Sequence, residues 1–319
     1  MKICILLATY NGEQFLKAQL NSILQQSKKS WECIIRDDGS IDDSVSIIKE
    51  YCKKDFRFTL LLDDKEPQGN AKDNFALLME AGLNTDADCF FFCDQDDVWM
   101  TNKIELMDLE FKKHDTRQPL LIHHDLEVVN QDLIQLSPSF IQFRCIDINA
   151  DFSKLLGRNR VTGCASACTR KLIEISLPIP SEAIMHDHWL GLVASYVGEL
   201  YFLDKSLIKY RQHDNNVIGA KPFKVNLSLI TSKERLIKRL LPFHKTILQS
   251  QALLHSINRN EYLKSVNKAT LQAYAQIPSM TKIQKTRAIL RFGFFQKNWL
   301  TKATTFIKFF MYSSKYYND

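Results

Sequence analysis

Short apolar runs alternate with amphipathic stretches over the first 120 residues, and this alternation restricts the possible folds more than any other feature of the sequence. The apolar runs are typical of buried strands, and the stretches between them place apolar residues at helical spacing. Strands are expected over residues 3–8, 31–36, 58–62, 89–93 and 120–124. Helices are expected over residues 15–24, 45–51 and 70–83, the last capped by Asn70 or Asp73. Stacked βαβ units of this kind predict an α/β, Rossmann-like fold with a mostly parallel sheet flanked by helices.

The residues that directly follow three of these strands are polar, and two of the three groups are acidic. The groups are Thr9-Tyr10-Asn11-Gly12, Asp37-Asp38-Gly39-Ser40 and Asp94-Gln95-Asp96-Asp97. Ligands bind outside the carboxyl ends of strands in open α/β sheets, so these groups are candidates for one site. Carboxylates gathered in a cleft repel one another unless a cation offsets their charge. Oxygen ligands without the Cys and His ligands of zinc favour Mg²⁺ or Mn²⁺ together with a phosphate-bearing substrate.

Charge divides unevenly along the chain. Residues 221–319 carry 18 Lys and Arg against three acidic residues, whereas residues 1–220 carry 24 basic and 33 acidic residues. The C-terminal stretch has helical patterning rich in Leu, Ile and Phe. We therefore expect a domain of residues 1–220 and a basic helical extension of residues 221–319. This extension favours an anionic surface as partner, although a solvated basic face or packing on the first domain are alternatives.

The remaining bulk features predict a cytoplasmic protein. No stretch approaches the roughly 20 apolar residues that span a bilayer, and no secretory signal is visible. The eight cysteines all precede residue 170, several of them inside apolar runs, and they lack zinc spacing. They are interpreted as small buried hydrophobes in a reducing compartment.

Seven short motifs occur in a fixed order between residues 3 and 215. They are LATYNG (7–12), DDGSID (37–42), GNAKDNF (69–75), DQDDVW (94–99), TGC (162–164), HDHW (186–189) and YRQH (210–213). In these motifs the chain resembles glycosyltransferase family 2 enzymes of the GT-A fold. It is most similar to the rhamnosyltransferase-like branch of bacterial cell-surface polysaccharide synthesis, which makes O-antigen and capsule. The C-terminal hundred residues lie outside the resemblance.

The resemblance implies a role for individual residues. The donor nucleotide-sugar would be bound by Thr9, Tyr10, Asn11, Asp37, Asp38, Lys72, Asn74, Asp94 and Gln95. Asp37 would accept from the ring N–H of uracil or thymine, and Lys72 and Asn74 would lie near the pyrophosphate. Mn²⁺ or Mg²⁺ would be held by Asp96, Asp94 and His213. For Asp38, a purely structural role in a turn or helix cap stays open.

The resemblance also places a catalytic base at Asp187. A carboxylate on the cleft wall can take the proton of an acceptor hydroxyl, whereas in isolation Asp187 would be interpreted as a helix cap. Many relatives carry Glu directly before this Asp, and His186 stands there in this chain. Gly163, His188 and Trp189 are expected on the acceptor side, with core packing as the alternative for His188 and Trp189.

The implied function is inverting transfer of L-rhamnose from dTDP-L-rhamnose to a saccharide hydroxyl. The acceptor would be lipid-linked, and the basic extension would hold the enzyme at the inner face of the plasma membrane. A UDP-hexose such as UDP-glucose or UDP-galactose is the alternative donor. A nucleotidyltransferase would share the acidic metal site, but the sequence lacks a Gly-rich phosphate loop. A nucleic-acid-binding protein would explain the basic extension and leave the acidic first domain unexplained, so no nucleic-acid partner is expected.

Overall fold

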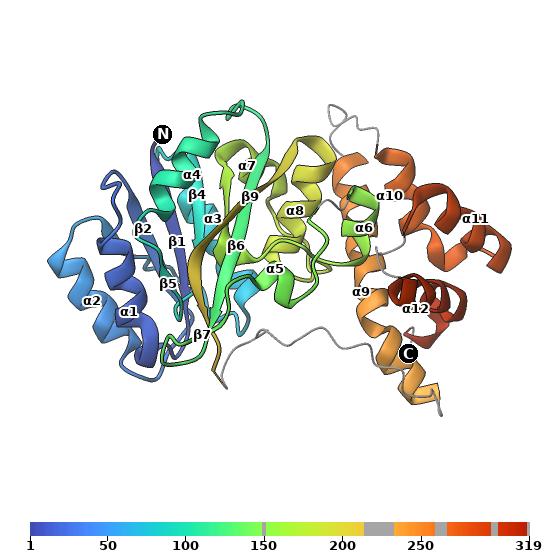
Figure 1. Ribbon diagram of the computed structural model, residues 1–319, viewed down its shortest axis with the longest axis horizontal. Coiled ribbons are helices and arrows are strands. Elements are labelled where there is room, and N and C mark those ends of the chain that lie inside the picture. Colours follow the sequence, from blue (N-terminus) through green and yellow to red (C-terminus); the bar gives the residue numbers. More distant parts are fainter. Residues whose placement is uncertain (149–150, 214–232, 259–266, 295–298, 318–319) are drawn as a thin grey trace.

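A computed structural model describes residues 1–148, 151–213, 233–258, 267–294 and 299–317. Helices cover both faces of a central sheet, and the C-terminal helices gather beside α6 and α8 at one side of it (Figure 1). In chain order the strands are β1 (Ile3–Thr9), β2 (Glu32–Asp37), β3 (Phe58–Leu60), β4 (Cys89–Cys93), β5 (Val98–Trp99), β6 (Leu120–Val129), β7 (Gln135–Ser137), β8 (Ser166–Thr169) and β9 (Glu199–Arg211).

Most of the helices are short and lie between these strands. They are α1 (Glu13–Leu24), α2 (Ser44–Lys54), α3 (Ala71–Gly82), α4 (Lys103–Phe111), α5 (Phe140–Phe143), α6 (Phe152–Gly157), α7 (Arg170–Ser176), α8 (His186–Val197), α9 (Lys233–Asn258), α10 (Lys268–Ala275), α11 (Lys282–Phe292) and α12 (Trp299–Met311). Single 3₁₀ turns are η1 (Gly163–Ala165), η2 (Ile277–Ser279) and η3 (Ser314–Tyr316).

The first half of the sheet agrees with the sequence expectation. Strands β3, β2, β1 and β4 lie side by side in this order and all run parallel. Every residue of β1 and β4 is buried, because both strands are interior and helices cover the two faces of the sheet. Interior strands of this kind have continuous apolar sequences. The expected cap is confirmed as well, since the Asn70 side chain accepts from the N–H of Asp73 at the start of α3.

The second half of the sheet is built differently. β8 pairs antiparallel with both β4 and β6, β6 pairs parallel with β9, and β5 pairs antiparallel with β9. β6 continues to Val129, well past the expected strand over 120–124. Parallel order therefore holds for β1 to β4 and for β6 with β9. Antiparallel pairings join these groups to each other and to the short strands β5 and β7.

The C-terminal helices share a hydrophobic core with the sheet domain. One buried cluster contains Leu6 of β1, Trp189 of α8, Ile247 of α9 and Tyr274 of α10. The expected boundary between residues 220 and 221 lies outside the described residues, but α9 and α10 pack on α6 beyond it. Packing on the first domain is one of the alternatives that the sequence leaves open for the basic extension. None of the helices in the described ranges is long and apolar enough to cross a membrane.

Candidate active site

Three strand ends meet at one edge of the sheet. Because β1, β2 and β4 are parallel neighbours, Thr9 lies opposite Asp37 and Leu7 lies opposite Cys93. The three polar groups that follow these strands are therefore brought together, as the sequence predicts.

Gln95 ties the loop after β4 to the loop after β1. Its Oε1 accepts from the Thr9 hydroxyl at 2.6 Å and from the Tyr10 N–H at 2.8 Å, while its Nε2 donates to the Tyr10 carbonyl at 3.0 Å. Gly12 is needed beside it, because a Cβ at this position would lie 2.3 Å from Gln95 Oε1. The Gln95 amide thus holds the two loops together, and the Tyr10 side chain beside it is exposed.

Asp37 and Asn11 hold the loop after β2. The Asp37 carboxylate accepts from the N–H groups of Gly39 and Ser40 and from the Ser40 hydroxyl. Asn11 donates its N–H to Ser40 Oγ at 2.7 Å and accepts from the N–H of Ile41 at 2.9 Å. The loops after β1 and β2 therefore form one hydrogen-bonded rim around the strand ends.

Asp38 faces into the protein. It is 4% exposed, and its carboxylate accepts from Arg36 Nη1 and from the N–H groups of Gln68 and Gly69. Arg36 Nη1 also donates to Asn74 Oδ1 at 3.1 Å, and Asn74 is buried as well. These contacts connect the end of β2 to the start of α3, which is the structural role that the sequence left open for Asp38.

Lys72, in the first turn of α3, contacts the loop before α8. Its Nζ donates to the carbonyl of Ser181 at 3.1 Å and lies 3.4 Å from a carboxylate oxygen of Asp73. The ammonium group is consequently held near the entrance to α8.

The loop after β4 contains three carboxyl groups, those of Asp94, Asp96 and Asp97. Burial, and then the charge of Asp96, raises the pKa of Asp94 to about 7. Asp96 Oδ2 contacts His213 Nε2 at 2.8 Å, although the two residues are 117 positions apart. Arg211 fixes this contact, because its N–H donates to Asp97 Oδ1 and its Nε donates to the carbonyl of Asp96. The end of β9 thus positions His213 beside the acidic loop.

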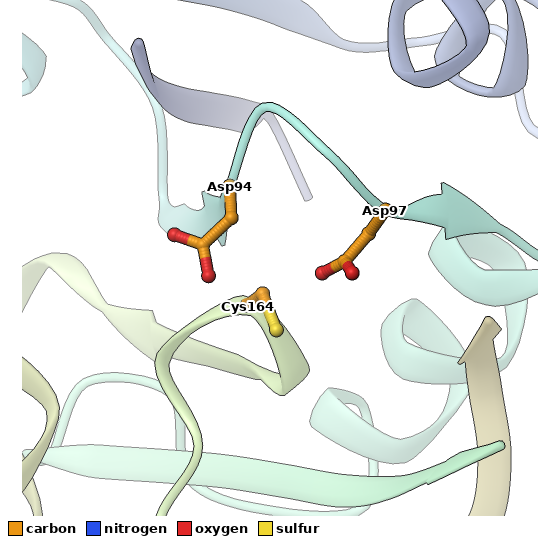
Figure 2. Close-up of side chains that lie close together, drawn as sticks. All are labelled: Asp94, Asp97 and Cys164. Carbon is orange, nitrogen blue, oxygen red and sulfur yellow. The ribbon is translucent and has the colours of Figure 1, made fainter. Parts of the chain in front are cut away.

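A second cluster lies behind this loop, and sequence reasoning did not assign it. Figure 2 shows the carboxylates of Asp94 and Asp97 on the same side of the turn as Cys164, with potential ligand atoms of the three residues within 4.8 Å of one another. Asp97 is fully buried, and burial raises its pKa well above the usual range. Lys103 is also fully buried, and its Nζ donates to the Cys164 carbonyl at 2.8 Å.

These two clusters offer different ligand chemistry. Within the described ranges, Asp94, Asp97 and Cys164 form the group with metal-ligand spacing, whereas the sequence predicted Asp94 with Asp96 and His213. A thiol suits softer ions than Mg²⁺ or Mn²⁺. Burial raises the pKa of the Cys164 thiol well above its usual range, which favours the neutral form. Oxygen from Asp94 and Asp96 and nitrogen from His213 are the better set for a hard cation.

Asp187 lies in the first turn of α8 and is 6% exposed. Its Oδ1 accepts from Asn159 Nδ2 at 2.9 Å and from the His188 N–H at 2.6 Å, and its Oδ2 accepts from the Gly163 N–H at 3.0 Å. Burial nevertheless raises the pKa of Asp187 to about 6, because desolvation outweighs these donors. The charge of Asp187 also contributes to the raised pKa of Asp94, so the two carboxylates lie close enough to interact electrostatically.

The residues on either side of Asp187 in the sequence are buried in the core. His186 lies against Phe75 with ring centroids 4.0 Å apart, and burial lowers its pKa to about 3, so it is neutral. His188 Nε2 donates to the Leu155 carbonyl, and Trp189 is buried with its indole N–H donating to Ser176. His188 and Trp189 therefore take the packing alternative.

Gly163 is the remaining residue expected on the acceptor side. Its N–H is one of the three donors to Asp187, and a Cβ here would lie 2.8 Å from His186 Nε2. The TGC motif thus acts on the Asp187 carboxylate through its backbone.

Two features of the site can be compared with those of known proteins. One is the carboxylate-rich loop after β4, and the other is the separate buried carboxylate of Asp187. The family model of glycosyl transferase family 2 matches residues 4–174, more than half of the chain. The chain belongs to glycosyl transferase family 2. The match contains all three strand-end loops but ends before Asp187 and His213, which are connected to them by the tertiary contacts described above.

Two bacterial relatives of this family 2 member cover most of its length. The dTDP-rhamnosyl transferase RfbG of Shigella flexneri is 28% identical over 67% of this chain and 74% of its own. WfgD of Escherichia coli, a UDP-Glc:alpha-D-GlcNAc-diphosphoundecaprenol beta-1,3-glucosyltransferase, is 25% identical over 76% of this chain and 80% of its own.

Solved structures with a similar fold are glycosyltransferases of the GT-A fold. S. aureus TarS in complex with UDP-GlcNAc superposes with a TM-score of 0.53 at 14% identity, over 90% of this chain and 83% of its own. GalNAc-T7 with UDP, GalNAc and Mn²⁺ gives a TM-score of 0.53 at 11% identity, over 86% of this chain and 54% of its own. At these identities the likeness shows the fold alone, and the family 2 member has the GT-A fold.

Proposed function

We propose that this family 2 glycosyltransferase transfers L-rhamnose from dTDP-L-rhamnose to a hydroxyl of a lipid-linked saccharide, with inversion, in the synthesis of a bacterial cell-surface polysaccharide. The observation that carries the proposal is Asp187, a desolvated carboxylate that three N–H donors hold at the start of α8, close enough to the acidic loop after β4 for its charge to raise the pKa of Asp94. The rhamnosyl donor is supported by the similarity to RfbG, and the lipid-linked acceptor by the similarity to WfgD.

The donor nucleotide is assigned to the rim formed by the loops after β1 and β2. Thr9, Tyr10 and Asn11 line one side, and Asp37 on the other side has lone pairs left to accept from the N–H of a pyrimidine base. Lys72 is assigned to the diphosphate, because an ammonium group is a suitable point charge for it. Asp38, Asn74 and Gln95 shape the pocket from behind through the hydrogen bonds described above.

The site is assigned one divalent cation, Mn²⁺ or Mg²⁺. Asp96 and His213 would hold it together with Asp94, and their oxygen and nitrogen donors fit such an ion. Burial, and then the charges of Asp96 and Asp187, raises the pKa of Asp94 to about 7, and the proximity of these carboxylates is the physical reason to expect a positive charge here. When bound, the ion neutralises the charge that develops on the departing nucleoside diphosphate.

Asp187 is assigned as the general base. The acceptor oxygen forms a bond to the anomeric carbon, the bond from that carbon to the diphosphate breaks, and the hydroxyl proton passes to the Asp187 carboxylate. Attack opposite the leaving group inverts the anomeric centre. A base with a pKa near 6 is mostly ionised at neutral pH and still basic enough to accept the proton in the transition state.

Two variants separate donor binding from chemistry. Asp96→Ala should abolish the Mn²⁺-dependent thermal stabilisation by dTDP or UDP, because it removes a ligand of the assigned ion. Asp187→Asn should keep this stabilisation and lower kcat by about 10²–10⁴-fold, the usual contribution of a general base. Near-normal turnover of Asp187→Asn would mean that another group takes the proton. A panel of dTDP- and UDP-sugars, scored by sugar transfer, decides the donor, and turnover of UDP-sugars alone would rule out rhamnose.

A UDP-hexose is the second candidate donor. WfgD supports it, since that relative uses UDP-Glc and covers a larger share of this chain than RfbG does. Uracil and thymine present the same ring N–H to Asp37, so base recognition alone does not separate the two donors.

The enzyme is assigned to the cytoplasmic face of the plasma membrane, as a peripheral protein. The net positive charge of residues 221–319 supports attraction to anionic lipid, and a lipid-linked acceptor would be presented at that surface.

A further inference from the structure

Helix α12 is apolar on two opposite sides, and only one of them is packed against the rest of the protein. Phe309 and Tyr312 are buried, and the Phe309 ring lies 4.8 Å from that of Phe243 on α9. At 100° per residue, Ile307, Phe310 and Met311 lie on the opposite side of the helix with Phe306 at its edge, and all four are exposed, by 37 to 49%. A helix that is apolar all round requires cover on both sides.

Helix α11 continues this exposed surface. Ile283 and Leu290, seven residues apart and therefore on one side of the helix, are 67% and 69% exposed. Lys282 Nζ lies 4.6 Å from the centroid of the Phe310 ring, which places the start of α11 beside the end of α12. We call the six exposed side chains of Ile283, Leu290, Phe306, Ile307, Phe310 and Met311 the α11–α12 apolar face.

The sequence segment that contains this face has charges of one sign. Residues 262–318 contain ten Lys and Arg and no Asp or Glu. On α11, Arg287 and Arg291 are exposed next to Ile283 and Leu290, and Lys302 is exposed on α12. Large apolar side chains rimmed by cations match a membrane surface that offers an acyl interior below anionic headgroups. The absence of acidic residues from the sequence of this region disfavours a basic partner surface, including a second copy of the same face.

We propose that the α11–α12 apolar face inserts into the headgroup region of an anionic bilayer, as the site through which this enzyme docks on the membrane. This deepens the proposed function, because it names the surface that would bring a lipid-linked acceptor to the site. α12 packs on α9 through Phe309 and Phe243, and α9 contacts the Asp187 region, since Gln249 bonds to His188 and to the N–H of Ile184. Docking thus holds the base-bearing helix at a fixed height above the lipid surface.

Co-sedimentation of the full chain with vesicles tests this docking site. Wild type should sediment with vesicles of phosphatidylglycerol and phosphatidylethanolamine, less so at high salt, and much less with vesicles of phosphatidylcholine alone. Ile307→Ser/Phe310→Ser should lower the partition coefficient by about tenfold or more, because two large apolar side chains are removed from the inserted face. Arg287→Gln/Arg291→Gln should lower it on phosphatidylglycerol only.

Phe56→Ser is the matched control, since Phe56 is 92% exposed on the sheet domain and far from α12 in sequence. It should sediment as wild type does. Equal sedimentation of wild type and Ile307→Ser/Phe310→Ser would overturn the proposal. So would a wild-type dimer in light scattering that this double substitution converts to a monomer without altering vesicle binding, because the occupant would then be a second copy.

The outcome is independent of the assigned chemistry. Asp187→Asn should sediment as wild type does, and Ile307→Ser/Phe310→Ser should keep the wild-type rate of nucleotide release from the sugar donor in solution. Near-normal transfer by Asp187→Asn with retained sedimentation would count against the assigned base alone, whereas retained turnover with unchanged sedimentation of the double variant would count against the docking face alone.

Discussion

At the scale of single residues, Asp187 shows two opposed effects on one carboxylate. Three N–H groups stabilise its charged form, and burial destabilises it by more, so its pKa is raised to about 6. The neutral His186 beside it adds no positive charge that would oppose this. The assigned base consequently titrates close to physiological pH.

We therefore expect turnover to fall in mild acid. With saturating donor and Mn²⁺, kcat should decrease about tenfold per pH unit below a pKa near 6, because only the ionised Asp187 accepts the proton. Asn159→Ala removes one donor to the carboxylate and should move this acid limb to higher pH. A pH profile that is flat from pH 7 to 5 in wild type would contradict the assignment.

Burial of His186 predicts a loss of stability in acid. In the folded protein the pKa of His186 is lowered to about 3 from an ordinary 6.5. Between these two pH values the imidazole is protonated in the unfolded chain and neutral in the folded protein. Stability is full above pH 6.5 and decreases as the pH falls from 6.5 toward 3. The effect of His186→Phe on the free energy of unfolding should therefore depend on pH. Relative to wild type, the variant should be more stable at pH 5 than it is at pH 8, by on the order of 1–2 kcal/mol. Urea unfolding at the two pH values measures this, and the exposed His255→Phe should show no such difference.

Some side chains at the strand ends lie on the rim formed by the loops after β1 and β2, and others are turned inward and hold these loops in place. The sequence located the strand-end groups correctly, because strands buried on both faces leave continuous apolar runs and the site follows them. It did not separate Asp37, on the rim, from Asp38, which is turned inward to Arg36. Neighbouring residues in a loop have no fixed periodicity, so their directions depend on contacts with distant segments.

At the scale of elements, α9 is joined to the N-terminal turn of α8. Gln249 is fully buried, accepts from the N–H of Ile184 at 2.8 Å and donates to His188 Nδ1 at 3.2 Å. Because His188 follows Asp187 and its N–H bonds that carboxylate, Gln249 is a positioning residue for the assigned base.

Gln249→Leu should therefore destabilise the protein and displace α8. The buried His188 ring loses a partner, which costs about 1–3 kcal/mol, and the Ile184 N–H loses its acceptor. We expect kcat to fall with little change in the KM for the donor, and Gln249→Glu to recover part of kcat, because its carboxylate can still accept from Ile184. The exposed Gln276→Leu is the control, and equal effects of the two Leu variants in thermal unfolding and kinetics would exclude this positioning role.

At the scale of the whole molecule, the C-terminal helices complete the core on one face of the sheet. Ile247, Leu253 and Tyr274 belong to the same buried cluster as Leu6 and Trp189. The sequence suggested an appended module because charge changes sign near residue 220, yet charge reports on the surface and not on which apolar faces meet.

Truncation after residue 232 should consequently fail to give a folded catalytic domain. The exposed apolar surface of α6 and α8 should make the truncated chain aggregate, and the lost packing should abolish cooperative unfolding. Size-exclusion chromatography and calorimetry on the truncated and full chains check this. A monomeric, cooperatively unfolding fragment would show that residues 1–232 form an independent domain.

The sequence by itself determined the local features: strands β1 to β4, the helices between them, the cap at Asn70 and the three strand-end groups. Each of these depends on residues close together in the chain, whose apolar period and capping chemistry are visible in one window. Only the tertiary structure decided the antiparallel half of the sheet, the contact of His213 with Asp96, the buried cluster of Asp97, Cys164 and Lys103, and the docking of α9 on α8. Apart from the short β6–β7 pairing, these pairs lie about 40 to 120 positions apart, so what brings them together is the packing of the whole chain, which no local pattern encodes.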